Sequence, residues 1–237
     1  AEKLWSHSLS DELRVGAHEQ PVLFVEHPVN PPAARARTAE VFFERLQAES
    51  LCLYGSDALA LFAAGRTSGV VVDCGSECRV SAVYEGSTLS HSYQSVDVGG
   101  RMLTDLVMKL MTEQGFSFTC GGEREVVRDV KEKLCRCAPL AIQNLSDRSL
   151  GDTRRYELPD RQVIDVAEFV QTHVPEAMFD PTLLTFQEDG CGVHRLVLNA
   201  VERCDADLRS LLLDSVVLVG GSSCFPGMDS RLQHEMT

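Results

Sequence analysis

The sequence of 237 residues lacks long apolar runs, and none of its stretches approaches the roughly 20 residues needed to span a bilayer. It is also poor in positive charge. Its 22 Lys and Arg residues stand against 35 Asp and Glu, and the resulting net charge of −13 argues against binding to nucleic acid phosphates. The opening residues, 1–7, contain no hydrophobic segment of the kind found in secretory signals. We therefore expect neither nucleic acid nor a membrane as a partner.

The nine cysteines lack the spacing of a zinc site. Two close pairs, Cys74/Cys78 and Cys135/Cys137, each stand without a matching second pair. An odd and scattered set of this kind is typical of buried free thiols in a reducing compartment. The sequence thus predicts no direct metal ligands.

Apolar content is an ordinary 44%, and strand-like and helix-like patterns alternate along the chain, as in an α/β protein. The predicted strands cover residues 21–25 and 69–73. Helices are predicted from residue 31 past 46, and over residues 59–64, 105–112 and 123–137. The polar stretch 146–155 is predicted to be an exposed loop.

The most informative segment, VVLVGGSSCFPG, covers residues 216–227. Its apolar run predicts a strand buried on both faces, and the following Gly220 and Gly221 would let backbone come close to a ligand. A helix predicted from Met228 would turn its free N–H groups toward the same ligand. A tight strand-to-helix turn without a ligand is the alternative.

Several segments resemble stretches of actins in order and in spacing. They are AAGRTSG (63–69), YEG (84–86), DVGGRMLTD (97–105), EREVVRDVKEKLC (123–135), YELPD (156–160), CDADLR (204–209) and the segment 216–227. The chain is therefore identified as a divergent actin or actin-related protein. The resemblance implies an α/β, actin-type (ribonuclease H-like) two-lobe ATPase fold with an incomplete first lobe.

The resemblance also implies domain limits, and it implies that other residues or a partner cover part of the first lobe. Residues 1–68 would form part of the first lobe (subdomain 1), residues 69–98 and 186–237 subdomain 3, and residues 99–185 subdomain 4. A partial first lobe would expose sheet edges and apolar surface. We expect either a longer natural chain or a partner that covers this surface.

In actins a nucleotide lies between the lobes, and the residues on its adenosine side have counterparts here. They are Gly100, Arg128, Lys131, Glu132, Gly220, Gly221, Ser222 and Phe225. Positions 128, 131 and 132 share one helical face, where a carboxylate can accept from ribose hydroxyls and cationic stems can cover a base. A solvated charged face is the alternative.

The phosphate side departs from the actin pattern. The first phosphate loop of actins would lie upstream of residue 1, and the second reads DCGSECR over residues 73–79. Asp73 and Gly75 remain, whereas Ser76 replaces an aspartate and Glu77 replaces a glycine, which adds bulk and a repelling charge. The usual histidine is not recovered, and Ser56 replaces the glutamine that orients the attacking water.

These changes predict weak or absent binding of ATP or ADP with Mg²⁺. Asp73 would contact the metal only through water, and no catalytic residue is expected. The favoured function is a non-hydrolysing structural or regulatory subunit of a larger cytoskeletal or ciliary assembly in the cytoplasm. No self-filament is expected, because the loop over residues 84–93, which contacts the neighbouring subunit in actin filaments, is altered.

Two alternatives stay open. One is an ATP-binding, filament-forming actin relative. The other is a nuclear actin-related subunit of a chromatin-modifying complex.

Overall fold

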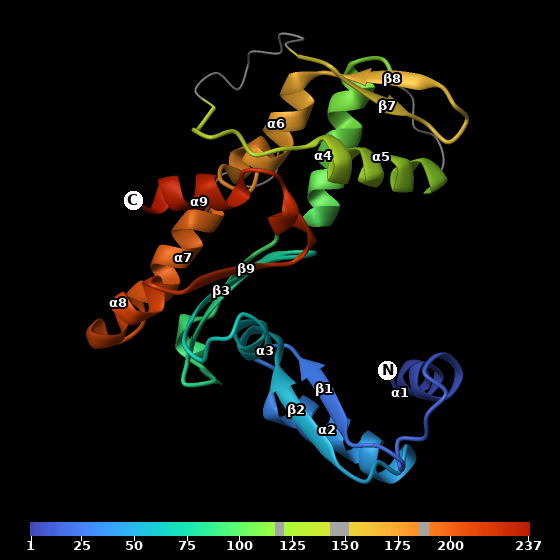
Figure 1. The fold of residues 1–237 in the computed structure, drawn as a ribbon, viewed down its shortest axis with the longest axis vertical. Helices are drawn as coiled ribbons and strands as arrows, with labels where there is room; N and C mark the ends of the chain where they lie inside the picture. Colours follow the sequence, from blue (N-terminus) through green and yellow to red (C-terminus); the bar gives the residue numbers. More distant parts are fainter. Residues whose placement is uncertain (117–120, 143–151, 185–189) are drawn as a thin grey trace.

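The computed structural model describes residues 1–116, 121–142, 152–184 and 190–237. Two lobes are visible in Figure 1, the smaller formed by the N-terminal residues and the larger by the rest of the chain. Helix α3 (Ser56–Ala63) lies between them and begins directly after the last strand of the smaller lobe.

The smaller lobe is built on two parallel strands, β1 (Val22–Glu26) and β2 (Leu51–Gly55). Around them lie α1 (Glu2–His7), the π-helical turn η1 (Ser8–Glu12), α2 (Pro32–Glu40) and its π-helical continuation η2 (Val41–Arg45). The rings of Trp5, Phe24 and Phe42 form its core, with centroids 5.1 to 5.4 Å apart. The other face of β1 leaves Leu23 and Val25 exposed, at 55% and 54%.

The larger lobe contains a five-stranded sheet in the order β5–β4–β3–β9, with β6 also paired to β4. The strands are β3 (Gly69–Cys74), β4 (Cys78–Tyr84), β5 (Ser87–Thr88), β6 (Gln94–Val96) and β9 (Val216–Val219). β3 runs antiparallel to β4 and parallel to β9. A short 3-10 turn, η3 (Ser90–Ser92), separates β5 from β6.

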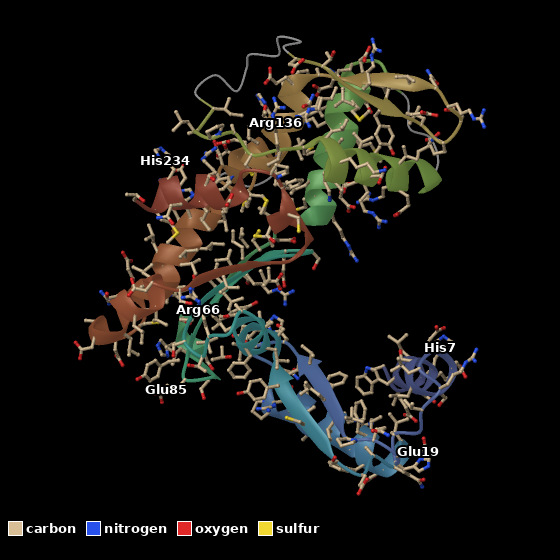
Figure 2. The ribbon with its side chains drawn as sticks, viewed as in Figure 1. His7, Glu19, Arg66, Glu85, Arg136 and His234 are labelled. Carbon is tan, nitrogen blue, oxygen red and sulfur yellow. The ribbon has the colours of Figure 1, made fainter. Side chains whose placement is uncertain are left out.

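Side chains alternate between the two faces of this sheet along each strand, and both faces contribute to a hydrophobic core. Val71 and Val83 pack against Ala58 and Leu61 of α3. The opposite face contributes Val70 and its neighbours to the main core of the lobe. Arg66, labelled in Figure 2, donates from Nη1 to the Asp214 carbonyl at 3.4 Å, which ties the inter-lobe connection to the start of β9.

Helices and a hairpin complete the larger lobe. They are α4 (Gly100–Glu113), α5 (Gly121–Leu134), the hairpin of β7 (Arg154–Glu157) and β8 (Val163–Val166), α6 (Glu168–Glu176), η4 (Pro181–Leu183), α7 (Val193–Glu202), α8 (Ala206–Leu213), η5 (Gly221–Cys224) and α9 (Met228–Met236). One continuous core joins these helices to the sheet, from Val70 to Leu232. Its members come from all three predicted segments of the second lobe, whose domain limits stay predictions.

A buried ion pair connects α9 to α6. Arg231 and Glu176 are only 1% and 4% exposed, and two hydrogen bonds of 2.7 Å join the guanidinium to the carboxylate. Arg231 Nη1 also donates to the carbonyls of Ala138 and Leu140, at 3.3 and 3.1 Å. The guanidinium lies 4.6 Å from the ring centre of Phe179.

The predicted elements agree with the structure in type, with three corrections. The stretch 146–155 was predicted to be a loop, yet Arg154 and Arg155 belong to β7, and residues 146–151 lie outside the described part. α5 ends at Leu134 instead of residue 137. The backbone N–H of Cys137 donates to the Pro226 carbonyl at 2.9 Å, outside the helix, and so does not continue the helical hydrogen bonds. β9 is half-buried, not fully buried, because it pairs with β3 alone at the edge of its sheet.

The cysteines of the described residues are all free thiols, and Cys120 lies outside that part. Cys52 and Cys224 are exposed, so the prediction of burial is wrong for these two. Burial raises the pKa of Cys135 and Cys137 to about 12, which keeps both thiols protonated and unreactive. Within the described residues, no group of three or more His, Cys, Asp or Glu side chains could hold a metal ion.

No helix among the described residues has both the length and the apolar character required to cross a membrane.

Replacing Glu176 with Gln is expected to lower the free energy of unfolding by about 3 kcal/mol or more, because it leaves the buried charge of Arg231 without a counter-charge. Urea denaturation followed by circular dichroism measures the change. Arg155→Gln is the control, since the Arg155–Asp165 pair is exposed and 3.6 Å long and should contribute little. Equal midpoints for the two variants would contradict a stabilising role of the buried pair.

Candidate functional site

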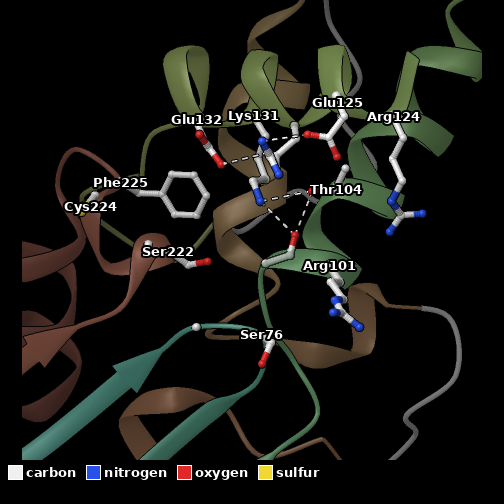
Figure 3. Close-up of a pocket in the computed structure, with 14 residues that line it drawn as sticks. Ser76, Arg101, Thr104, Arg124, Glu125, Lys131, Glu132, Ser222, Cys224 and Phe225 are labelled. Carbon is white, nitrogen blue, oxygen red and sulfur yellow. Dashed lines mark hydrogen bonds and ion pairs between the residues drawn. The ribbon is translucent and has the colours of Figure 1, made fainter. Parts of the chain in front are cut away.

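A cavity of about 830 Å³ lies between α4, α5, η5 and the β3–β4 hairpin (Figure 3). Eight of the ten predicted site residues line it: Gly75, Gly100, Arg128, Lys131, Glu132, Gly221, Ser222 and Phe225. Asp73 and Gly220 do not. The volume is within the range of pockets that hold nucleotide-sized ligands.

Lys131 is the most buried charged side chain of the cavity, at 5% exposure. Its Nζ donates to the Gly100 carbonyl at 2.9 Å and to Thr104 Oγ1 at 3.1 Å, so it joins α5 to the first turn of α4. Burial lowers the pKa of Lys131 below its ordinary value, while Glu132 acts in the opposite direction. The two hydrogen bonds fix one wall of the cavity without any ligand.

Arg128 and Glu132 lie on the same face of α5, as the helical spacing predicted. Arg128 pairs with Glu125 at 2.7 Å and with Glu132 at 3.7 Å. All three side chains are more than half exposed, so Glu132 keeps oxygen atoms free to accept hydrogen bonds from a ligand. The shared helical face of positions 128, 131 and 132 lines the cavity, and their contact with a nucleoside stays a prediction.

Gly220 occupies the tight turn after β9, where φ is +89°. A Cβ atom at this position would lie 2.6 Å from the carbonyl carbon of Cys74 and 2.7 Å from Asp73 Oδ1. The turn therefore packs directly on the end of β3. Gly220 supports the cavity from behind and does not face it.

The segment after this turn forms the 3-10 helix η5, which presents Ser222, Cys224 and Phe225 to the cavity. α9 begins only at Met228, which is buried and does not line the cavity. The prediction that the N-terminus of the last helix faces a ligand is therefore wrong. The Pro226–Gly227 turn redirects the chain before α9 starts, with Gly227 in a left-handed conformation.

The β3–β4 hairpin holds Asp73 away from the large cavity. Asp73 lies opposite Arg79 in the strand register, and the two side chains form an ion pair of 3.3 Å between Oδ2 and Nη2. Arg79 Nε lies 3.3 Å from Glu77 Oε1. Arg79 thus bridges both carboxylates of the hairpin.

Asp73 and Ser56 line a second, smaller cavity of about 40 Å³, together with Arg79 and Tyr93. This volume suffices for about one water molecule. Tyr93 OH lies 3.1 Å from His27 Nε2 of the smaller lobe, so residues of both lobes lie at the small cavity. Cys74 and Cys78 close the hairpin behind it, and their mutual hydrogen bond, followed by burial, raises the pKa of Cys74.

Sequence patterns missed several residues of the large cavity: Arg101, Thr104, Arg124, Glu125 and Cys224. Ser76 also lines it, although it had been noted only as a replacement in the phosphate loop. The position of Arg101 one residue after Gly100, and of Arg124 and Glu125 one turn before Arg128, was the available signal.

A two-lobe α/β fold with a large cavity between a glycine turn and two helices is an arrangement that suits a nucleotide-sized ligand. The Actin family model matches residues 1–237, and the chain belongs to the actin family. The predicted α/β fold of actin type is confirmed by this match and by the mixed sheet.

Proteins of the actin family generally bind ATP or ADP with Mg²⁺, and the two halves of such a ligand fit this chain unequally. The large cavity offers the ring of Phe225 and the partly exposed carboxylate of Glu132, which suit an adenosine. The β3–β4 hairpin suits Mg²⁺ poorly, because the Asp73 carboxylate is paired with Arg79 and a divalent cation requires several oxygen ligands or their bound waters.

Replacing Gly220 with Ala is expected to lower the free energy of unfolding by about 3 kcal/mol. About 1 kcal/mol comes from the positive φ and about 2 kcal/mol from contact with the β3 backbone. Gly65→Ala is the control, since Gly65 has a φ of +72° but no atom within 4 Å of an added Cβ. Equal melting temperatures for the two variants would show that the close packing on β3 is unimportant.

Proposed function

We propose that this chain is a non-hydrolysing structural or regulatory subunit of a cytoskeletal assembly, with an adenosine pocket that binds adenine nucleotides weakly. The observation that carries the proposal is the position of Asp73. Its carboxylate is neutralised by Arg79 and lines the small cavity, apart from the large cavity that fits a nucleoside.

Hydrolysis requires a water molecule that is oriented and activated next to the terminal phosphate. The small cavity has room for such a water, but Asp73 is already bonded to a guanidinium there. Ser56, in the place of the glutamine of actins, has a short side chain with one hydroxyl. These residues support binding without turnover.

The surface of the smaller lobe supports a role inside an assembly. Leu23 and Val25 lie side by side on the exposed face of β1, and Leu4, Leu13 and Phe43 are exposed on the surrounding helices and turns. The adjacent Leu23 and Val25 leave one face of β1 apolar and uncovered among the described residues, and such a face favours a covering partner. A cytoplasmic, cytoskeletal location is proposed with this role.

The loop over residues 84–93 supports a subunit that does not self-assemble. Ser92 Oγ accepts from Ala82 N at 2.8 Å and donates to the Leu89 carbonyl at 2.7 Å, while Tyr93 contacts His27. These contacts hold the loop to its own chain. The net charge of −13 also opposes stacking of identical copies.

ATP hydrolysis by the purified chain is expected to be undetectable, at least about 100-fold slower than in an actin filament, since positioning of the water is lost. Phosphate release from Mg²⁺-ATP, followed with a coupled colorimetric assay, measures the rate. Asp73→Asn is the matched variant and should behave like the parent. Phosphate release at an actin-like rate that Asp73→Asn abolishes would refute the proposal.

The purified chain is expected to remain free of helical filaments in polymerising salt, where an actin control assembles. Negative-stain microscopy and light scattering monitor the assembly. In its natural source the chain should be recovered at fixed stoichiometry with larger proteins. Filaments of the isolated chain would favour the filament-forming alternative, and recovery with chromatin-modifying proteins would favour the nuclear one.

A further inference from the structure

We infer that Arg101 and Arg124 bind the phosphate groups of a nucleoside diphosphate in the large cavity without a divalent cation. This inference rests on the nucleotide binding proposed above and specifies the form of ligand that the cavity takes.

The charge balance of the cavity is opposite to that of the whole protein. The chain carries a net charge of −13, yet the cavity is lined by four cationic and two acidic side chains: Arg101, Arg124, Arg128, Lys131, Glu125 and Glu132. A concave site whose lining has a net positive charge attracts anionic ligands. The cavity therefore favours an anion on an otherwise acidic molecule.

The four cations differ in how far they are already occupied. Lys131 Nζ donates to two oxygen atoms of α4, and Arg128 is paired with Glu125 and Glu132. Among the described residues Arg124 pairs with Asp105 alone, which is 2.6 Å from Nη1 and does not line the cavity. Most of the five N–H groups of its guanidinium thus remain available.

Arg101 is the cation with the greatest freedom to bind a ligand. Throughout residues 1–116, 121–142, 152–184 and 190–237, no hydrogen bond or ion pair engages its guanidinium. Figure 3 shows Arg101 and Arg124 on the side of the cavity away from Phe225, with Ser76 at its floor. An aromatic wall facing a guanidinium wall suits a base at one end and phosphates at the other.

The β3–β4 hairpin brings no carboxylate to this cavity. It contributes only Gly75 and Ser76 to the lining, and Arg79 bridges Asp73 and Glu77. The two carboxylates of the cavity, Glu125 and Glu132, both contact Arg128. A divalent cation would find few free oxygen ligands, so guanidinium groups are left to neutralise the phosphates.

The test is calorimetric titration of the whole chain with adenosine, ADP and pyrophosphate, each in excess EDTA and in Mg²⁺. ADP is expected to bind about tenfold more tightly than adenosine, with less than a twofold change between EDTA and Mg²⁺. Arg101→Gln should weaken ADP and pyrophosphate about tenfold and leave adenosine unchanged. Asp105→Asn should strengthen both anions a few-fold, because it frees Arg124.

Lys109→Gln is the matched control, because Lys109 is an exposed cation on the same helix, α4, and does not line the cavity. It removes the same charge and should change ADP affinity less than twofold. ADP binding that requires Mg²⁺, or equal effects of Arg101→Gln and Lys109→Gln, would overturn the inference.

The outcomes also separate this inference from the proposed function. Pyrophosphate binding that depends on Arg101, without any adenosine binding, would support the phosphate wall and refute the adenosine pocket. Adenosine binding that ADP does not improve would support the pocket and refute the phosphate wall. No binding of any of the three ligands would refute both.

Discussion

The buried ion pair of Arg231 and Glu176 is the constraint on which the candidate site depends. One guanidinium joins α9, which follows the glycine turn, to α6 and to the carbonyls just after α5. These segments adjoin α5 and η5, two of the elements that line the large cavity. Removing two charges from water is costly and is offset only when the geometry and the remaining hydrogen bonds are satisfied, so such a pair favours one arrangement of its neighbours over others.

Each of the two cavities has one cationic side chain that holds neighbouring segments together. In the hairpin, Arg79 satisfies Asp73 and Glu77 together, which explains how a glutamate is tolerated where an actin has a glycine. In the large cavity, Lys131 uses its hydrogen bonds to hold α4 against α5. A cation therefore stabilises each wall, and the guanidinium groups of Arg101 and Arg124 keep donors for a ligand.

Much of the site could be predicted because it depends on local geometry. Helical periodicity alone places Arg128, Lys131 and Glu132 on one face, and the structure turns that face toward the cavity. Arg101 could not be placed in this way, since its direction depends on how α4 packs against α5, whereas Arg124 lies one turn before Arg128 on α5 and shares its periodicity. The isolation of Asp73 also required the strand register, which sets Arg79 opposite it.

The same distinction applies to the fold. The buried run of β3 and the amphipathic face of α5 were clear from apolar patterns, whereas the half-burial of β9 follows from its edge position. A pattern of four apolar residues cannot reveal how many neighbours a strand will have. Likewise, the polar residues Arg154 and Arg155 gave no sign that they would pair with β8.

The parallel pairing of β3 with β9 has a consequence for biosynthesis. Val70 pairs with Val216, so the central sheet of the larger lobe is complete only after residues far along the chain have left the ribosome. At ordinary translation rates this delay is on the order of ten seconds. The two strands of the smaller lobe are closer in sequence, so this lobe can form during that time. The valines of β3 stay without their partner strand β9 until it is synthesised. Newly made chains would thus depend on chaperones during synthesis more than the finished fold does.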